Sequence, residues 1–256
     1  MHPVLLGPVK SFGFLLAVSF AVGIWLALKR GRRHEIAPET IYDLSFVILL
    51  TSIIGVRLVY VLTHLEEFSG RWLRVFAFPE GGLTLYGGLL LAVAASWVFC
   101  RRRRLSFLRI ADVMLPSVAL GIGITRIGCF LAGCCYGLPC DLPWAVHFPA
   151  FAPATRHFGA VGVHPSQLYS SLAGFALFGL LLWWERRSER PGQTMGRFLL
   201  LYGVLRFAVD FTRYYEPTQR WLFGWSNNQW FSVTLLGVGL YVLLWVARAR
   251  PGANGR

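Results

Sequence analysis

Arginines lie inside apolar stretches of the sequence, among them Arg57, Arg126, Arg206 and Arg213. A guanidinium group at membrane depth must face protein or water, and a buried charge needs a partner. Asp210 is the one acidic residue predicted at the same depth, so the positive charge is in excess. Because arginine forks suit phosphate oxygens, this excess predicts a binding site for a phosphate-bearing anion.

One of these stretches carries a regular polar pattern. Tyr202, Arg206, Asp210 and Arg213 fall at i, i+4, i+8 and i+11, within a stripe of about 80° on a helix. Asp210 would then lie one turn from both arginines, which predicts an ion-paired stripe. Two interpretations remain open, since such a stripe either joins helices or serves a ligand. For Arg206 and Arg126 the second interpretation is favoured, because one carboxylate cannot neutralise all four arginines.

The elements that would position these residues are membrane spans. Of the 256 residues, 55% are hydrophobic and 14% charged, with a mean hydropathy of +0.54 that argues against an ordinary soluble enzyme. The first span lacks a small-residue cleavage pattern and is not expected to be a cleaved signal peptide. The fold class predicted is an all-α polytopic bundle, forming a single transmembrane domain over residues 1–256, with seven spans: 12–28, 41–62, 83–100, 111–132, 166–184, 196–215 and 228–247.

The distribution of Lys and Arg between loops predicts the orientation. Fifteen of these residues lie in the loops and tail on one side of the membrane and five in the loops on the other side. This bias places the N-terminus outside and the C-terminus in the cytoplasm. The net charge of +13 fits an anionic membrane surface better than a nucleic acid. In this orientation the four arginines and Tyr86 share the outer half of the membrane. The sequence therefore predicts an outer-leaflet site for an anionic phospholipid headgroup.

Glycines and cysteines surround these polar residues. Gly87 and Gly88 follow Tyr86, and either close helix packing or backbone contact with a ligand would explain them. Cys129, Cys134, Cys135 and Cys140 form C-x4-C-C-x4-C, which differs from common zinc-site spacing. We expect no metal and interpret them as small residues near a helix end, although a disulfide among the last three stays open. Residues 133–165 are predicted to form a small extracytoplasmic head, and Asp43 and Asp112 to sit at helix starts as caps.

The segment Arg126-Ile-Gly-Cys-Phe-Leu-Ala-Gly-Cys-Cys-Tyr-Gly137 resembles the signature of the prolipoprotein diacylglyceryl transferase family, R-[IL]-G-N-F-x-N-G-x-x-x-G. Further matches occur in the family's order, over roughly residues 40–230. They are Asp43-Leu, Glu80-Gly-Gly with Gly87-Gly88, Pro143-Trp-Ala-Val-His-Phe-Pro149, His164-Pro-Ser-Gln-Leu-Tyr169, Tyr202-Gly-x-x-Arg206-Phe, Asp210-Phe-Thr-Arg213 and Asn228-Gln229.

The resemblance implies a seven-span transferase of the bacterial cytoplasmic (inner) membrane that needs no cofactor. Such an enzyme moves diacylglyceryl from phosphatidylglycerol to the lipobox cysteine of a prolipoprotein signal peptide, the first step of lipoprotein maturation. By position, Arg126 would bind the donor phosphate, Arg206 would stabilise the leaving phosphate and Tyr202 would orient it. The remaining substrate-binding candidates are Gly137, which matches the last signature glycine, together with Arg57, Arg213, Gly87, Gly88 and Cys129.

The chain departs from the family pattern at three positions. Tyr86 stands where the family commonly has His, Cys129 where it has Asn, and Phe12 where it has Tyr. We expect Tyr86 to take over the role of base for the acceptor thiol, although a free tyrosine has a pKa of about 10. Two alternatives follow: a family-like membrane protein that binds anionic lipid without chemistry, and a lipid or anion transporter. The inner half lacks the polar route that transport would need.

Overall fold

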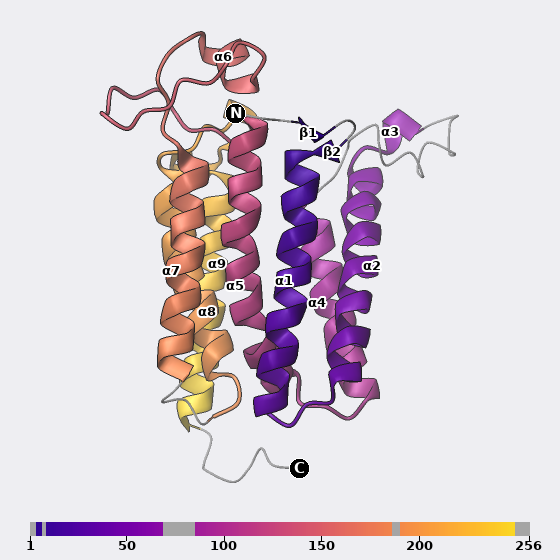
Figure 1. Ribbon diagram of the computed structural model, residues 1–256. Coiled ribbons are helices and arrows are strands. Elements are labelled where there is room, and N and C mark those ends of the chain that lie inside the picture. Colours follow the sequence, from indigo (N-terminus) through magenta and orange to yellow (C-terminus); the bar gives the residue numbers. More distant parts are fainter. Residues whose placement is uncertain (1–3, 7–8, 69–84, 186–189, 249–256) are drawn as a thin grey trace. The chain divides into compact units, whose positions relative to one another are not determined.

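The computed structural model describes residues 4–6, 9–68, 85–185 and 190–248 (Figure 1). Every predicted span corresponds to a long helix in this part of the chain. These helices are α1 (Ser11–Arg33), α2 (Pro38–Thr63), α4 (Leu85–Arg102), α5 (Phe107–Ala132), α7 (Ser166–Glu185), α8 (Gln193–Asp210) and α9 (Asn227–Arg248). The minor elements are β1 (Val4–Leu6), β2 (Val9–Lys10), α3 (Leu65–Phe68), α6 (Pro153–Phe158) and two 3-10 turns, η3 (Pro217–Gln219) and η4 (Leu222–Gly224).

The helices have the length and composition of membrane spans. Within the described residues, α1, α2, α5, α7 and α9 are long and apolar enough to cross a bilayer. Large apolar side chains such as Leu172 (67% exposed) and Tyr241 (68% exposed) are uncovered along them, as expected of surfaces that face lipid. Helices α4 and α8 have 18 residues each, and α8 contains Arg197, Arg206 and Asp210. The predicted class, an all-α polytopic membrane protein, is confirmed, whereas the orientation of the termini stays a prediction.

The sixth span is shorter than predicted. Helix α8 ends at Asp210, five residues before the expected end at residue 215. The backbone carbonyl of Thr212 accepts hydrogen bonds from Leu138 N (2.9 Å) and Ser166 Oγ (3.0 Å), so other segments hold the chain in a turn. Arg213 then forms an isolated antiparallel bridge with Gly137. The prediction that Arg213 continues a helical stripe is therefore wrong.

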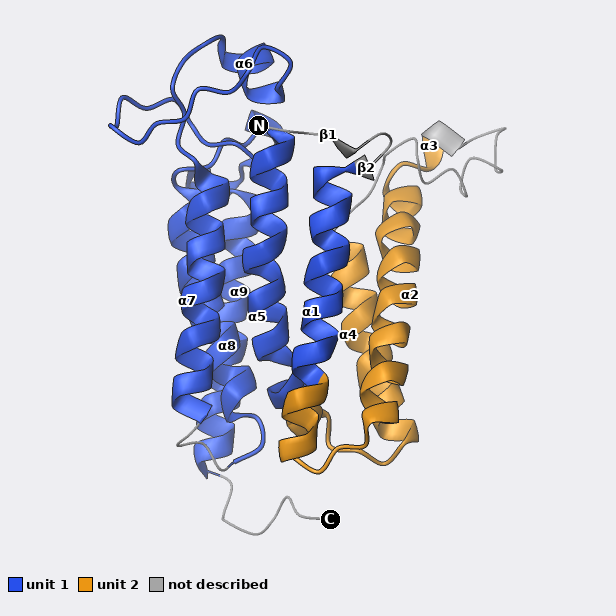
Figure 2. Ribbon diagram, in the orientation of Figure 1, with its two compact units in different colours: residues 1–27, 111–256 blue, residues 28–110 orange. Residues whose placement is uncertain are grey.

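The chain divides into two compact units, residues 1–27 with 111–256 and residues 28–110 (Figure 2). The prediction of a single transmembrane domain stays a prediction. In the smaller unit, α2 and α4 pack through glycines: a Cβ on Gly55 would overlap the Gly87 carbonyl, and one on Gly88 would lie 3.0 Å from Ser52 O. Such contacts let the two helix backbones approach closely. Just after the end of α4, Arg103 forms an exposed ion pair with Asp43 of α2 at 2.7 Å.

Helices α7, α8 and α9, and α5 from Ala111 onward, belong to the larger unit. Ala119, Leu177, Leu181 and Phe198 form the buried apolar cluster between three of them. Helix α8 lies against α9, where a Cβ on Gly203 would lie 3.0 Å from Ser232 O. The start of α8 is held by Asp112 of α5, whose carboxylate accepts hydrogen bonds from Gly192 N (2.6 Å) and Met195 N (2.7 Å).

The expected capping roles of the two acidic residues need correction. Asp112 is the sixth residue of α5 and binds the N-terminus of α8, so it caps a different helix from the one that contains it. Asp43 likewise lies inside α2, which begins at Pro38, and pairs with Arg103. A carboxylate beside unpaired N–H groups is favourable at the start of any helix, but the sequence does not show which helix Asp112 serves.

Residues 133–165 form a compact structure rather than a simple connection. Val146 and Val163 exchange backbone hydrogen bonds (3.0 and 3.1 Å), and Cys140 N donates to Gly162 O. Phe148, Ala152, Val163 and Ala154 of helix α6 form a small buried cluster. The side of the membrane that this segment occupies stays a prediction.

Candidate functional site

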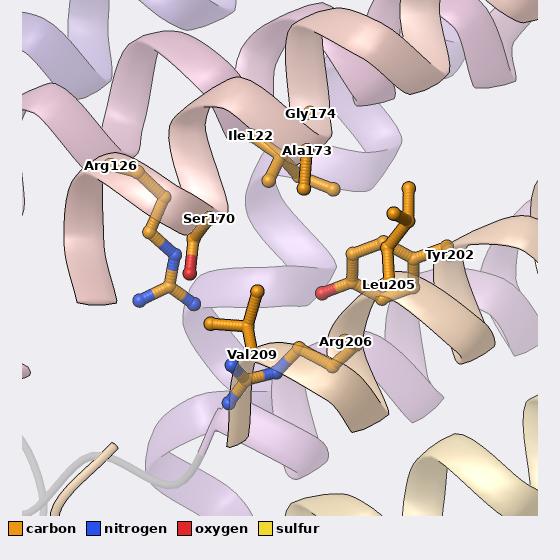
Figure 3. Close-up of a pocket in the computed structure, with 9 residues that line it drawn as sticks. All are labelled: Ile122, Arg126, Ser170, Ala173, Gly174, Tyr202, Leu205, Arg206 and Val209. Carbon is orange, nitrogen blue, oxygen red and sulfur yellow. The ribbon is translucent and has the colours of Figure 1, made fainter. Parts of the chain in front are cut away.

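A pocket lies between α5, α7 and α8 in the larger unit. Its polar lining consists of Arg126 from α5, Ser170 from α7, and Tyr202 and Arg206 from α8. Figure 3 shows the two guanidinium groups approaching the same region beside Val209, with the Tyr202 hydroxyl directed into the space between the helices. The rest of the lining is apolar: Ile122, Ala173, Gly174, Leu205 and Val209. Three residues predicted to act on one phosphate therefore share a single pocket.

Arg206 is neutralised inside the protein. Its Nη1 lies 2.7 Å from Asp210 Oδ1, as the i,i+4 spacing predicts, and both side chains are almost fully buried (8% and 0% exposed). Arg206 Nη2 also donates a hydrogen bond to Tyr215 Oη at 2.9 Å, and that hydroxyl donates to Asp210 Oδ1 at 2.9 Å. The predicted ion pair is confirmed for Arg206, and it fixes the guanidinium group at the pocket wall.

Further side chains complete this network. Asn228 Nδ2 donates to Tyr215 Oη at 2.8 Å, and Ser226 Oγ donates to Asp210 Oδ2 at 3.1 Å. Burial raises the pKa of the Tyr215 hydroxyl, against the opposing charges of Arg206 and Arg213, so this group remains a neutral donor. Both carboxylate oxygens of Asp210 thus accept hydrogen bonds.

Arg126 differs from Arg206 in its charge balance. It is half-buried one turn before Cys129 on α5, and in the described part of the chain no carboxylate pairs with it. Since Asp210 offsets the charge of Arg206, the polar wall of the pocket retains one positive charge, that of Arg126. A half-buried cation without a protein partner is the arrangement expected where a ligand supplies the anion.

Arg213 lies outside the pocket lining but offers a further donor. Its guanidinium carbon is 5.1 Å from the centre of the Tyr215 ring, and its Nε is buried without a hydrogen-bond partner among the described residues. The helical stripe does not explain this placement, because Arg213 follows the end of α8. An unsatisfied buried donor on an arginine is consistent with an anion near this end of α8.

The remaining candidates Tyr86, Arg57, Gly87 and Gly88 belong to the smaller unit. Arg57 is buried (5% exposed) and its guanidinium group lies over the Tyr60 ring at 5.7 Å, while Tyr86 is half-buried at the start of α4. Gly87 and Gly88 face α2, so helix packing accounts for both of them. Substrate contacts of these four residues stay predictions, and Glu80, Gly81 and Gly82 lie outside the described residues.

Gly137 and Cys129 border the loop that follows α5. Gly137 N donates to His164 O at 3.1 Å, and a Cβ there would overlap that carbonyl, so only glycine fits this crossing. Cys129 is buried near the end of α5, where its thiol lies close to those of Cys134 and Cys135. Hydrogen bonds from Cys129 and Cys134, together with the charges of Arg213 and Arg126, lower the pKa of the Cys135 thiol. The interpretation of these cysteines as small residues near a helix end missed this grouping.

Sequence reasoning also missed the supporting residues Tyr215, Ser226 and Gln167. Gln167 is 1% exposed and its Nε2 donates to Cys134 O at 2.8 Å, which anchors the loop after the signature segment. Gln167 and Asn228 belong to segments that match the family pattern, and this match is the sequence evidence that could have identified them. Tyr215 and Ser226 gave none, because their partners are brought to them only by the fold.

Comparisons with known proteins show the family of the chain. Residues 4–245 match the family model described as prolipoprotein diacylglyceryl transferase. Relatives named phosphatidylglycerol–prolipoprotein diacylglyceryl transferase include those of Pseudoalteromonas atlantica (37% identical; 97% of this chain, 90% of the relative) and Chromohalobacter salexigens (35%; 98% and 93%). A third, from Clostridium tetani, is 30% identical over 91% of this chain and 92% of its own. The chain therefore belongs to the prolipoprotein diacylglyceryl transferase family.

Proposed function

We propose that this membrane protein transfers a diacylglyceryl group from phosphatidylglycerol to the cysteine thiol of a prolipoprotein. Family membership and the names of the relatives support the reaction. The observation that carries the site assignment is the pocket in which Arg126, Tyr202 and Arg206 meet.

Charge balance supports phosphatidylglycerol as the occupant of this pocket. A phosphodiester carries one negative charge, and the polar wall retains the one positive charge of Arg126, because Asp210 compensates Arg206. Arg126 would hold the phosphate in the ground state. The fixed Arg206 guanidinium and the Tyr202 hydroxyl would act on the phosphate oxygen that gains charge as the bond breaks. The apolar lining residues would contact the glyceryl part of the lipid.

The chemistry is a substitution at the glyceryl carbon that bears the phosphate. The sulfur of the acceptor cysteine forms a C–S bond to this carbon while the C–O bond to the phosphate breaks. The electron pair stays on the phosphate oxygen, and glycerol 1-phosphate leaves. Tyr86 relays the thiol proton, which ends on the released phosphate monoester or in water. The acceptor thiol itself has a pKa of about 8.5, so modest assistance is sufficient.

The proposal includes a location and an acceptor motif. The excess of Lys and Arg in one set of loops supports an outward N-terminus. In that orientation Arg126 would lie in the outer half of the bacterial inner membrane. Phosphatidylglycerol of the outer leaflet would then meet a signal peptide whose lipobox cysteine lies just outside the bilayer. Reaction at this surface requires no lipid to cross the membrane.

The test is a reconstituted transfer assay with purified protein, phosphatidylglycerol and a lipobox peptide, in which mass spectrometry detects the thioether product. Arg126→Gln should abolish product formation and binding of phosphatidylglycerol. Arg109→Gln is the matched control, since Arg109 is exposed on the same helix far from the pocket. Lipid binding without product in the native protein would support the non-catalytic alternative, and unchanged transfer by Arg126→Gln would refute the site.

A further inference from the structure

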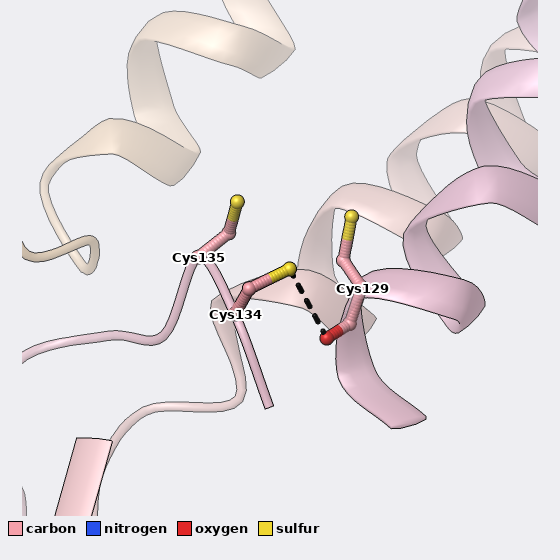
Figure 4. Close-up of side chains that lie close together, drawn as sticks. All are labelled: Cys129, Cys134 and Cys135. Atoms are coloured by element: carbon pink, nitrogen blue, oxygen red, sulfur yellow. Dashed lines mark hydrogen bonds between the residues drawn. The ribbon is translucent and has the colours of Figure 1, made fainter. Parts of the chain in front are cut away.

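Three thiols gather at the end of α5, beside the proposed phosphate site. The sulfur atoms of Cys129, Cys134 and Cys135 lie within 4.8 Å of one another (Figure 4). All three are free cysteines, and Cys134 Sγ donates a weak hydrogen bond to Cys129 O at 3.6 Å. Cys140, the fourth cysteine of this region, is not part of the group.

The loop conformation is what brings the three sulfur atoms together. Gly133 adopts φ +70° immediately after α5, and Cys135 adopts φ +60°, which is unfavourable for a residue with a side chain. The buried Gln167 side chain holds Cys134 O at 2.8 Å. The left-handed turn thus returns Cys134 and Cys135 toward the last turn of α5. A backbone strained in this way is a feature that a functional site can explain.

We propose that Cys129, Cys134 and Cys135 form a binding site for a soft, thiolate-preferring metal ion, Cu(I). Around one ion at metal–sulfur distances of about 2.3 Å, three thiolates lie about 4 Å apart. The observed sulfur atoms would therefore need to close by less than about 1 Å. Binding replaces the thiol protons, which pass to solvent, so it requires no oxidant or reductant.

Ligand number favours Cu(I) over Zn(II). Structural zinc sites use four protein ligands, whereas among the described His, Cys, Asp and Glu residues this group offers three.

The experiment is an anaerobic titration of the purified, detergent-solubilised protein with Cu(I), in competition with a chromophoric Cu(I) chelator. We expect one Cu(I) per chain, with sulfur-only coordination by X-ray absorption. Cys134→Ser and Cys135→Ser should each weaken binding at least about 100-fold. Cys140→Ser is the matched control and should bind as the native protein does. Monodisperse elution in size-exclusion chromatography shows that each variant is folded.

Several outcomes would overturn the proposal. These are the absence of Cu(I) binding to the native protein, full binding by the variant that lacks all three thiols, and tighter binding of Zn(II) than of Cu(I). A disulfide among these cysteines, in protein whose thiols were trapped at cell lysis, would also overturn it, because the ligands would be consumed. None of these readouts depends on transfer activity, so the site can fail while the proposed function stands.

Discussion

The buried ion pair of Arg206 and Asp210 can be compared with an exposed ion pair of the same N–O distance in the same protein. Arg206–Asp210 and Arg103–Asp43 both have N–O distances of 2.7 Å, but the first pair is 8% and 0% exposed and the second 54% and 46%. Breaking a buried ion pair typically costs about 3–5 kcal/mol, whereas an exposed pair contributes about 0–1 kcal/mol. Burial alone should therefore separate the effects of the same substitution at Asp210 and Asp43.

We predict that Asp210→Asn lowers the free energy of unfolding by at least about 3 kcal/mol, and that Asp43→Asn lowers it by less than about 1 kcal/mol. Asparagine preserves the shape and leaves an acceptor for Tyr215 or Ser226, so the loss reports mainly on the missing charge. In thermal unfolding in detergent, the first variant should unfold about 10 °C below the native protein. Equal shifts for the two variants would refute the argument that the Asp210 carboxylate neutralises a buried guanidinium group.

Three further predictions concern packing, catalysis and capping. Gly55→Ala should lower the midpoint of thermal unfolding, because the new Cβ would overlap the Gly87 carbonyl. Gly179→Ala should leave the midpoint unchanged, because nothing lies within 4 Å of a Cβ at that position. Equal midpoints for the two variants would contradict the close α2–α4 contact. Tyr86→Phe should cut transfer strongly in the reconstituted assay while phosphatidylglycerol binding is unchanged, and full activity would remove Tyr86 from the mechanism. Asp112→Ala should cost about 1–2 kcal/mol in denaturant unfolding, because two N–H groups of α8 lose their acceptor, and a neutral effect would show that water replaces it.

The sequence predicted the helices well because membrane spans are selected by length and apolarity, which are local properties. In the described residues, the long helices all lie where the apolar stretches are, and the pairing of Arg206 with Asp210 followed from the spacing of four residues. Arg126 was placed correctly on α5 because the signature segment begins there. These features depend on residues that are near one another in the chain.

The errors arose where distant segments meet. Helix α8 ends early because Leu138 and Ser166 bind the Thr212 carbonyl, and no periodicity within 196–215 could reveal those partners. The cysteine grouping depends on the left-handed residue Cys135, whereas spacing rules for metal sites assume regular turns. Asp112 caps a helix that begins some eighty residues later in the chain.

The polar character of α8 has a consequence for how the protein enters its membrane. A segment of 18 residues that contains Arg197, Arg206 and Asp210 is poorly suited to leave the protein-conducting channel alone. Charged residues in a span oppose insertion, by up to about 2.5–3.5 kcal/mol each for a charge at the helix centre. Helix α9 is long and apolar, and it packs on α8 through Gly203 and Gly239. Helix α8 should therefore partition into lipid only after α9 has been synthesised. In a nascent chain that stops before residue 227, a cysteine introduced into α8 should react with water-soluble thiol reagents. In a longer nascent chain that includes α9, the same cysteine should be protected.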